Sequence, residues 1–159
     1  MSKLIKIKIL SGIPGCGKST WARDFIAKNP DTKRINRDDL RMMFDDSRFT
    51  DGNESFVNKA KLALVKTCID FDKDMVIDDT HCYADYLVWF IGEIRAYAKG
   101  IDKPITIEIV DFDVDIDTAL DRNNKRDAKI DKNAIYFMDK SKKEINISNL
   151  NIDLHTIVK

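Results

Sequence analysis

The sequence predicts an α/β fold in which a parallel sheet of about five strands has helices on both faces. Apolar runs typical of buried strands alternate along the chain with segments of helical periodicity, and a glycine-rich motif joins the first run to the first helix. The expected strands are Leu4–Leu10, Thr32–Ile35, Met75–Ile77, Ile105–Phe112 and His155–Val158. Ligands of such sheets bind at the carboxyl ends of the strands, so functional residues are expected to follow the strands.

The glycine-rich motif matches the phosphate-binding loop G-x-x-x-x-G-K-[ST] at every position, between a strand and the expected helix Lys18–Lys28. Backbone N–H groups of such a loop bind the oxygens of a triphosphate, while Lys18 reaches the β- and γ-phosphates and Ser19 binds Mg²⁺. The residues assigned to ATP binding are Gly12, Ile13, Pro14, Gly15, Cys16, Gly17, Lys18, Ser19 and Thr20. The motif therefore predicts a three-layer P-loop NTPase fold that uses ATP and Mg²⁺.

Composition limits the remaining possibilities. A chain of 159 residues fits one domain over 1–159, and its 27 basic and 27 acidic residues cancel, so no global field attracts nucleic acid. A locally basic cleft can still hold a strand end. No apolar run approaches the ~20 residues of a membrane span, and the three cysteines lack metal-binding spacing. We expect a cytoplasmic protein with reduced thiols and no membrane partner; the sequence does not indicate its oligomeric state.

The other helices are expected between the later strands. The segment Glu54–Lys73 has apolar residues at intervals of three and four, which predicts one buried face. That face consists of Val57, Ala60, Leu64, Cys68 and Phe71. The remaining expected helices are Ala84–Ala98, Asp115–Arg126 and Asp131–Ile145. Asp115 fits a helix N-cap, and the preceding Asp111–Asp115 resembles a D-x-D phosphatase signature but lacks the Gly-Thr that follows it there.

The segment after the second strand, Asn36 to Arg41, allows two interpretations. An aspartate could cap a short helix that runs through Phe44. Alternatively, a carboxylate of the Asp38-Asp39 pair is a general base beside an anion clamp of Arg37 and Arg41. Arg41 would lie in the first turn of the helix, where the macrodipole disfavours a cation, and this favours the functional interpretation.

After the third strand comes Asp78-Asp79-Thr80-His81, where folds of this class place the carboxylate that supports Mg²⁺. The spacing does not choose between Asp78 and Asp79. His81 and His155 are isolated histidines, for which a surface or packed role is expected.

A second basic signal follows the fourth strand. Arg122 and Arg126 are four residues apart on a helix, share a face, and have no acidic residue positioned to neutralise them, whereas Asp121 and Lys125 form a surface pair. Such an arginine pair is suited to an external anion such as a transferring phosphoryl group, although a solvated charged face has the same pattern.

Together these motifs resemble the kinase domain of the bacteriophage polynucleotide 5′-hydroxyl kinases. The resemblance rests on Gly12 to Arg23, Phe25 to Pro30, Ile35 to Arg41, Asp79-Thr80, and Arg122 to Arg126, in the same order. It implies that Asp38 is the general base, that Arg41 contacts the acceptor's phosphate, and that Arg126 stabilises the transferred phosphoryl group. Asp79 and Thr80 would also face the acceptor. We expect no counterpart of the family's C-terminal 3′-phosphatase domain, and Arg126-Asp127-Ala128-Lys129 departs from the lid ending expected for the family.

The resemblance implies ATP-dependent phosphorylation of 5′-hydroxyl ends of DNA or RNA during end repair. Two alternatives remain open. A small-molecule P-loop kinase shares every donor residue and differs in its acceptor pocket, and a nucleotide-dependent switch binds ATP with little turnover.

Overall fold

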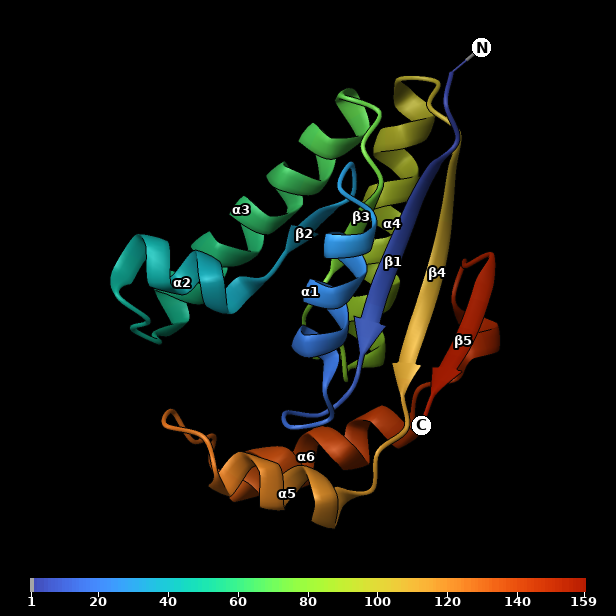
Figure 1. The fold of residues 1–159 in the computed structure, drawn as a ribbon. Helices are drawn as coiled ribbons and strands as arrows, with labels where there is room; N and C mark the ends of the chain where they lie inside the picture. Colours follow the sequence, from blue (N-terminus) through green and yellow to red (C-terminus); the bar gives the residue numbers. More distant parts are fainter. Residues whose placement is uncertain (1) are drawn as a thin grey trace.

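The computed structural model of the protein describes residues 2–159 (Figure 1). The elements in chain order are β1 (Ile5–Ser11), α1 (Lys18–Lys28), β2 (Lys33–Ile35), α2 (Arg37–Asp45), α3 (Asp51–Asp70), β3 (Met75–Ile77), α4 (Ala84–Gly100), β4 (Ile105–Phe112), α5 (Ile116–Asn124), α6 (Lys132–Lys143), the 3₁₀ turn η1 (Ile147–Asn149) and β5 (Leu154–Val158).

The five strands form one parallel sheet in the order β2-β3-β1-β4-β5, which confirms the expected fold class. β1 is central, and its Ile7 lies opposite Met75 of β3 and Ile107 of β4. The arrowheads of β1, β4 and β5 in Figure 1 point the same way, and the loop after β1 lies with α5 and α6 at that end of the sheet. The segments that follow β1, β2 and β3 are thereby brought together, although they are far apart in sequence.

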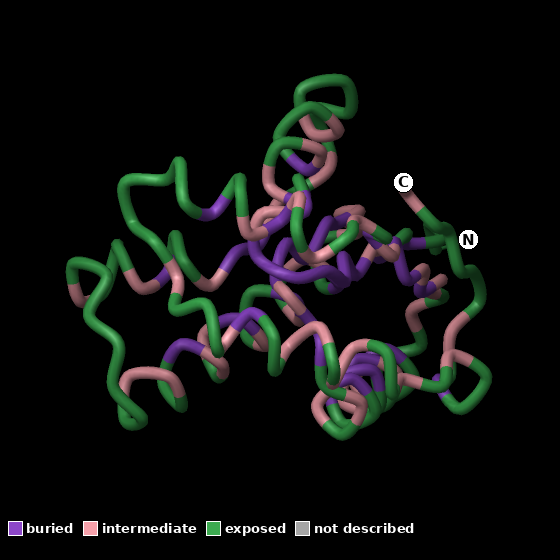
Figure 2. The backbone as a smooth tube through the Cα atoms, turned by 90° about the horizontal axis from the view of Figure 1, so that it is seen from below, coloured by how far each residue is buried: buried purple, intermediate pink, exposed green. Residues whose placement is uncertain are grey.

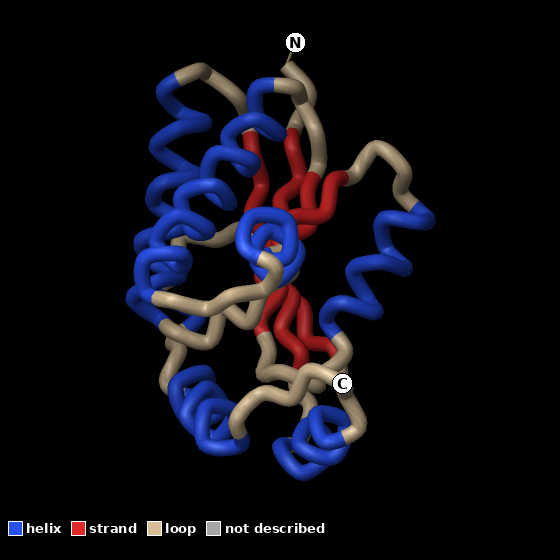
Figure 3. Tube along the Cα trace, turned by 90° about the vertical axis from the view of Figure 1, so that its left-hand side faces the viewer, coloured by secondary structure: helices blue, strands red, loops and turns tan. Residues whose placement is uncertain are grey.

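Helices lie on both sides of the strands (Figure 3), and the most deeply buried stretches of the chain are in the strands and the helix faces turned toward them (Figure 2). Successive strand side chains point to opposite faces, so the core has two parts. Ile7 and Ile77 belong to the cluster that includes Leu87 of α4. Val76 belongs to the cluster that includes Ala22 of α1.

The buried face of α3 differs from the expected one. Residues at intervals of four are buried, namely Val57, Lys61, Val65 and Ile69. Of the predicted face, Leu64 is 41% exposed and Phe71 is 71% exposed. The predicted apolar face was therefore wrong at Leu64 and Phe71, whereas Cys68 is partly buried against the core.

Most element ends lie within three residues of the predicted ones. Asp115 caps α5 as expected, since its carboxylate accepts a hydrogen bond from the amide of Thr118 at 2.9 Å. Asn29 ends α1 one residue before Pro30. Among residues 2–159 no helix is both long and apolar enough to cross a membrane. The single-domain organisation and the cytoplasmic location stay predictions.

Candidate active site

The Gly12–Ser19 loop joins the carboxyl end of β1 to α1 (Figure 1). The amide of Gly12 donates to the carbonyl of Thr80 at 2.9 Å, which ties the loop to the segment after β3. Lys18 is buried, and its ammonium lies 3.1 Å from the carbonyl oxygen of Ile13 and 3.5 Å from Sγ of Cys16. The ammonium is thus folded back over the loop, where the phosphates of a bound nucleotide belong. Thr20 follows, exposed, in the first turn of α1.

Two glycines give the loop its shape. Gly15 and Gly17 have φ angles of 85° and 97°, in the left-handed region that favours glycine. A Cβ atom added at Gly15 would lie 2.4 Å from the carbonyl oxygen of Ala119 in α5. The loop and α5 therefore touch through their backbones at a point where a side chain does not fit.

Gly15→Ala is accordingly expected to lower the free energy of unfolding by about 1–3 kcal/mol and to weaken ATP binding, because the backbone is strained and the Ala119 carbonyl must move. Gly52→Ala is the control: this glycine lies in α3 with nothing within 4 Å of the added Cβ, so stability should be unchanged or slightly higher. Denaturant unfolding of both variants measures the difference. Equal stabilities would show that the loop and α5 are not in close contact.

The candidate cation site involves Ser19 and Asp78. The Ser19 hydroxyl lies 3.2 Å from Oδ1 of the buried Asp78, whose other oxygen accepts from Arg34 at 2.8 Å (Nε) and 2.6 Å (Nη2). Mg²⁺ in phosphoryl-transfer enzymes is held by one or two protein oxygens together with phosphates and water, and a hydroxyl beside a carboxylate fits this requirement. The geometry favours Asp78 over Asp79, the choice that the sequence left open.

Asp79 instead belongs to a buried polar cluster. Its Oδ2 accepts from the ammonium of Lys61 at 2.8 Å and lies 3.3 Å from Nε of Arg37, while its Oδ1 accepts from the Arg37 amide at 2.9 Å. Burial by itself would raise the pKa of Asp79, but the charges of Lys61 and Arg37 outweigh it and hold the pKa well below its usual range. Asp79 therefore carries its negative charge inside the protein and anchors the first residue of α2.

His81 has the packed role that its isolation predicted. It is buried, Nδ1 lies 2.6 Å from the carbonyl oxygen of Leu10, and Nε2 lies 3.1 Å from the ammonium of Lys61. Burial lowers the pKa of His81 to about 3, so its ring is neutral at pH 7. Since an ammonium can only donate, we assign the ring proton to Nδ1, which donates to Leu10.

The start of α2 corrects the proposed aspartate cap. The N-cap is Asn36, whose side chain accepts from the amide of Asp39 at 2.9 Å and donates to the carbonyl of Asp78. Asp38 and Asp39 follow in the first turn, where the helix dipole favours negative charge. Asparagine is among the preferred N-cap residues, so this signal was available in the sequence.

Arg41 is held on two sides. Its guanidinium pairs with Asp38 in its own helix and with Glu54 in α3, including a 2.8 Å contact from Nη2 to the second Glu54 oxygen. The hydrogen bond to Glu54 is the main cause that raises the pKa of Arg41, and the same bond lowers the pKa of Glu54. Asp38 is 76% exposed, so its carboxylate is accessible beside a fixed cation.

Arg122 lies where α5 passes the phosphate-binding loop, but α5 ends at Asn124, so Arg126 follows the helix and the two arginines do not share one helical face as predicted. Nη1 of Arg122 donates to the carbonyl of Gly15 at 3.3 Å. Arg126 is exposed one turn later, and within residues 2–159 neither arginine pairs with a carboxylate. The neighbouring pair Asp121–Lys125 forms at 2.7 Å, as predicted. The buried Asn123 holds the following connection to α6 through both the amide and the carbonyl of Ile130. Arg122 is thus available to an anion at the loop, and Arg126 is exposed in the segment that follows α5.

Sequence reasoning missed Arg34, Glu54 and Lys61. Each is an ordinary charged residue in its own helix or strand, and each has a partner at least 13 residues away in the chain. One feature of the sequence indicated that Lys61 is buried: the residues four positions before and after it in the helix, Val57 and Val65, are apolar.

Residues 7–140 match the AAA domain family. The chain belongs to this family. A chain of the Pnkp1/Rnl/Hen1 RNA repair complex is 27% identical to it over 90% of its length, with a TM-score of 0.72, and only 45% of that longer chain is covered. Two more solved structures share its fold. A fungal RNA kinase is 16% identical, with a TM-score of 0.73, and the match covers 99% of this chain and 75% of that one. A gluconokinase from Sinorhizobium meliloti 1021 is 13% identical, with a TM-score of 0.56, and the match covers 99% of this chain and 83% of that one. The protein has the parallel α/β fold of P-loop kinases.

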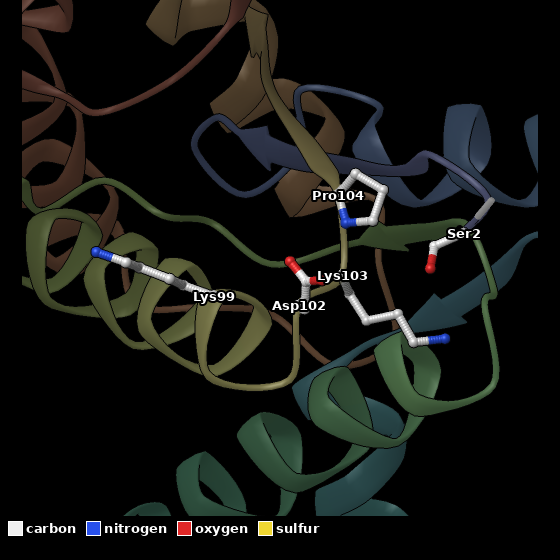
Figure 4. A pocket seen from close by; sticks show the side chains of 5 residues that line it. All are labelled: Ser2, Lys99, Asp102, Lys103 and Pro104. Carbon is white, nitrogen blue, oxygen red and sulfur yellow. The ribbon is translucent and has the colours of Figure 1, made fainter.

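A depression of about 410 Å³ lies elsewhere. It is lined by Ser2, Lys99, Asp102, Lys103 and Pro104, where α4 ends and β4 is about to begin (Figure 4). This is the amino end of β4, opposite to the carboxyl ends where the phosphate-binding loop lies, and its two lysine side chains extend in different directions. We assign it no part in phosphoryl transfer.

Proposed function

We propose that this protein is a polynucleotide 5′-hydroxyl kinase of the bacteriophage type. It transfers the γ-phosphate of ATP to 5′-hydroxyl ends of DNA or RNA in nucleic-acid end repair. The observation that carries the proposal is the pairing of the accessible Asp38 carboxylate with Arg41 at the carboxyl edge of the sheet. A hydroxyl acceptor needs a base, and an acceptor that carries a neighbouring phosphate needs a cation.

The contacts of Arg41 leave it able to bind a phosphate. A guanidinium has five N–H donors, and one each on Nε, Nη1 and Nη2 points to Glu54 or Asp38. One N–H on each of Nη1 and Nη2 remains to donate to a phosphate. Glu54 fixes the plane of the guanidinium, so little side-chain entropy is lost when the acceptor binds.

Each residue then has a defined task. Lys18 and the loop amides hold the donor phosphates, and Ser19 and Asp78 would hold Mg²⁺, which offsets phosphate charge when it is bound. Asp38 accepts the proton of the 5′-hydroxyl group, and Arg41 binds the phosphate on the 3′ side of the same nucleotide. Arg122 and Arg126 face the transferring group, and Thr80 and Asp79 support the acceptor side. The 27% identity to a chain of an RNA repair complex supports this substrate class.

The deciding experiment supplies labelled ATP with a 5′-hydroxyl oligonucleotide, a nucleoside 3′-phosphate and an unmodified nucleoside. We expect transfer to the first two and poor transfer to the nucleoside, because only the first two present a phosphate to Arg41. Arg41→Ala should lower kcat/KM for the oligonucleotide by ~10–100-fold, the equivalent of losing about 1.5–3 kcal/mol of charged hydrogen bonding. Arg48→Ala, at an exposed arginine just after α2, is the control and should have little effect.

Efficient phosphorylation of the nucleoside would instead favour a small-molecule kinase, a class to which the gluconokinase with the same fold belongs. Tight ATP binding without transfer to any hydroxyl group would favour a nucleotide-dependent switch.

A further inference from the structure

α3 carries a row of three polar side chains, and each contacts a residue of the proposed acceptor site. Glu54 pairs with Arg41, the Asn58 carbonyl accepts from Arg37 at 3.2 Å, and Lys61 pairs with Asp79. The spacing of four and three residues places them on one face of the helix. Lys61 is the innermost member, and its side chain is 0% exposed.

Two hydrogen-bond partners and two aromatic rings surround the ammonium of Lys61. One points to Asp79 at 2.8 Å and one to Nε2 of the neutral His81 at 3.1 Å. The charge also lies 4.3 Å from the ring centroid of Phe90 and 5.0 Å from that of Tyr86, within the range of cation–π attraction. A fully buried ammonium is costly, and apolar residues of similar volume often stabilise such a position equally well. Packing alone therefore does not account for a lysine here.

The contacts continue from Lys61 to the catalytic segment in two steps. Asp79 accepts from the backbone amide of Arg37, the first residue of α2, and the next residue is Asp38. On the other side, His81 bonds the carbonyl of Leu10 in β1, just before the phosphate-binding loop. The cluster thus joins α3, the segment after β3, the end of β1 and the start of α2.

We infer that Lys61 is a positioning residue of the acceptor site. By fixing the Asp79 carboxylate, it sets where α2 begins, and hence where Asp38 and Arg41 lie relative to the phosphate-binding loop. This inference rests on the proposed function, because Asp38 and Arg41 act on the acceptor in that proposal. The donor site has its own contacts through Lys18 and Ser19, so loss of Lys61 should affect the two substrates unequally.

The test compares Lys61→Met with Lys59→Met, an exposed lysine on the same helix, with a 5′-hydroxyl oligonucleotide as acceptor. Lys61→Met should raise the KM for the oligonucleotide at least tenfold while the KM for ATP stays within about twofold, and Lys59→Met should change neither. Amide hydrogen exchange at Arg37 should accelerate in Lys61→Met relative to the amides of α4. A folded Lys61→Met protein with an unchanged oligonucleotide KM would overturn the inference.

If the Lys61→Met protein does not fold, a second pair of variants tests the inference. Asp79→Asn and the double variant Asp79→Asn/Lys61→Met leave no buried carboxylate without its partner. If Lys61 acts through Asp79, the two proteins should have the same oligonucleotide KM within about threefold. A further tenfold loss in the double variant would contradict the inference. Absence of transfer by the unaltered protein would instead overturn the proposed function itself, and the inference with it.

Discussion

Replacement of Asp38 by asparagine is expected to lower kcat for transfer to a 5′-hydroxyl oligonucleotide by about 10²–10⁴-fold, the usual cost of removing a general base. The amide has nearly the size of the carboxylate and can still accept a hydrogen bond from Arg41. The Asp38 side chain is largely exposed and is not the cap of α2, so packing and the helix should be unaffected. What is lost is a group that accepts the hydroxyl proton.

ATP affinity should stay within a few-fold in this variant, since the donor is held by the loop residues. Titration of ATP binding and label transfer on the same preparation separate the two effects. Asp39→Asn is the matched control, because Asp39 is the next residue, is also exposed, and pairs with Arg34 rather than Arg41. Its turnover should remain within a few-fold of the unaltered protein. If Asp38→Asn kept near-normal transfer, the base would have to be sought at Asp39 or Asp79.

The sheet and the phosphate-binding loop could be predicted from sequence because their determinants are local. Short apolar runs define the buried strands, and the glycines at 15 and 17 permit backbone angles that favour glycine. The loop also lies between β1 and α1, the strand-to-helix context that the motif requires. Its position at the edge of the sheet then follows from the parallel topology alone.

The acceptor side depends on contacts that the sequence does not encode locally. Asp78 and Asp79 are adjacent, and Asp78 faces Ser19 in a segment held to β2 by the hydrogen bond of the Asp78 amide to the carbonyl of Ile35, at 2.8 Å. Glu54 reaches Arg41 only because α2 and α3 fold against each other. The local sequence pattern therefore indicated which types of residue lie at this edge of the sheet. Contacts between segments distant in the chain determine which of these residues pair.

The face of α3 shows the same limit in its packing. Residues at intervals of three and of four can both lie on one face of a helix, so Val57 could share a buried face with Leu64 or with Lys61. Apolarity favoured the face with Leu64 and Phe71, which the structure leaves exposed. Lys61 and Val65 are buried instead, since an ammonium can be accommodated where Asp79 and His81 meet it. The cost of burying a charge cannot be judged from sequence when its partners are 18 and 20 residues away.

Replacement of Arg126 by alanine is expected to lower kcat by about 10²–10³-fold, the cost of removing one donor that stabilises charge in a transition state. Arg126 is exposed at the end of α5 and has no carboxylate partner among residues 2–159, so its loss should leave stability unchanged. Lys125→Ala is the control, since that lysine pairs with Asp121 on the solvent side of the same turn. Arg126→Lys keeps the charge without the planar donor pair, and its rate should be intermediate. An interaction made only in the transition state lowers kcat and kcat/KM equally while ATP affinity is retained. A variant with normal kcat and a raised KM for ATP would show instead that Arg126 binds the ground-state donor.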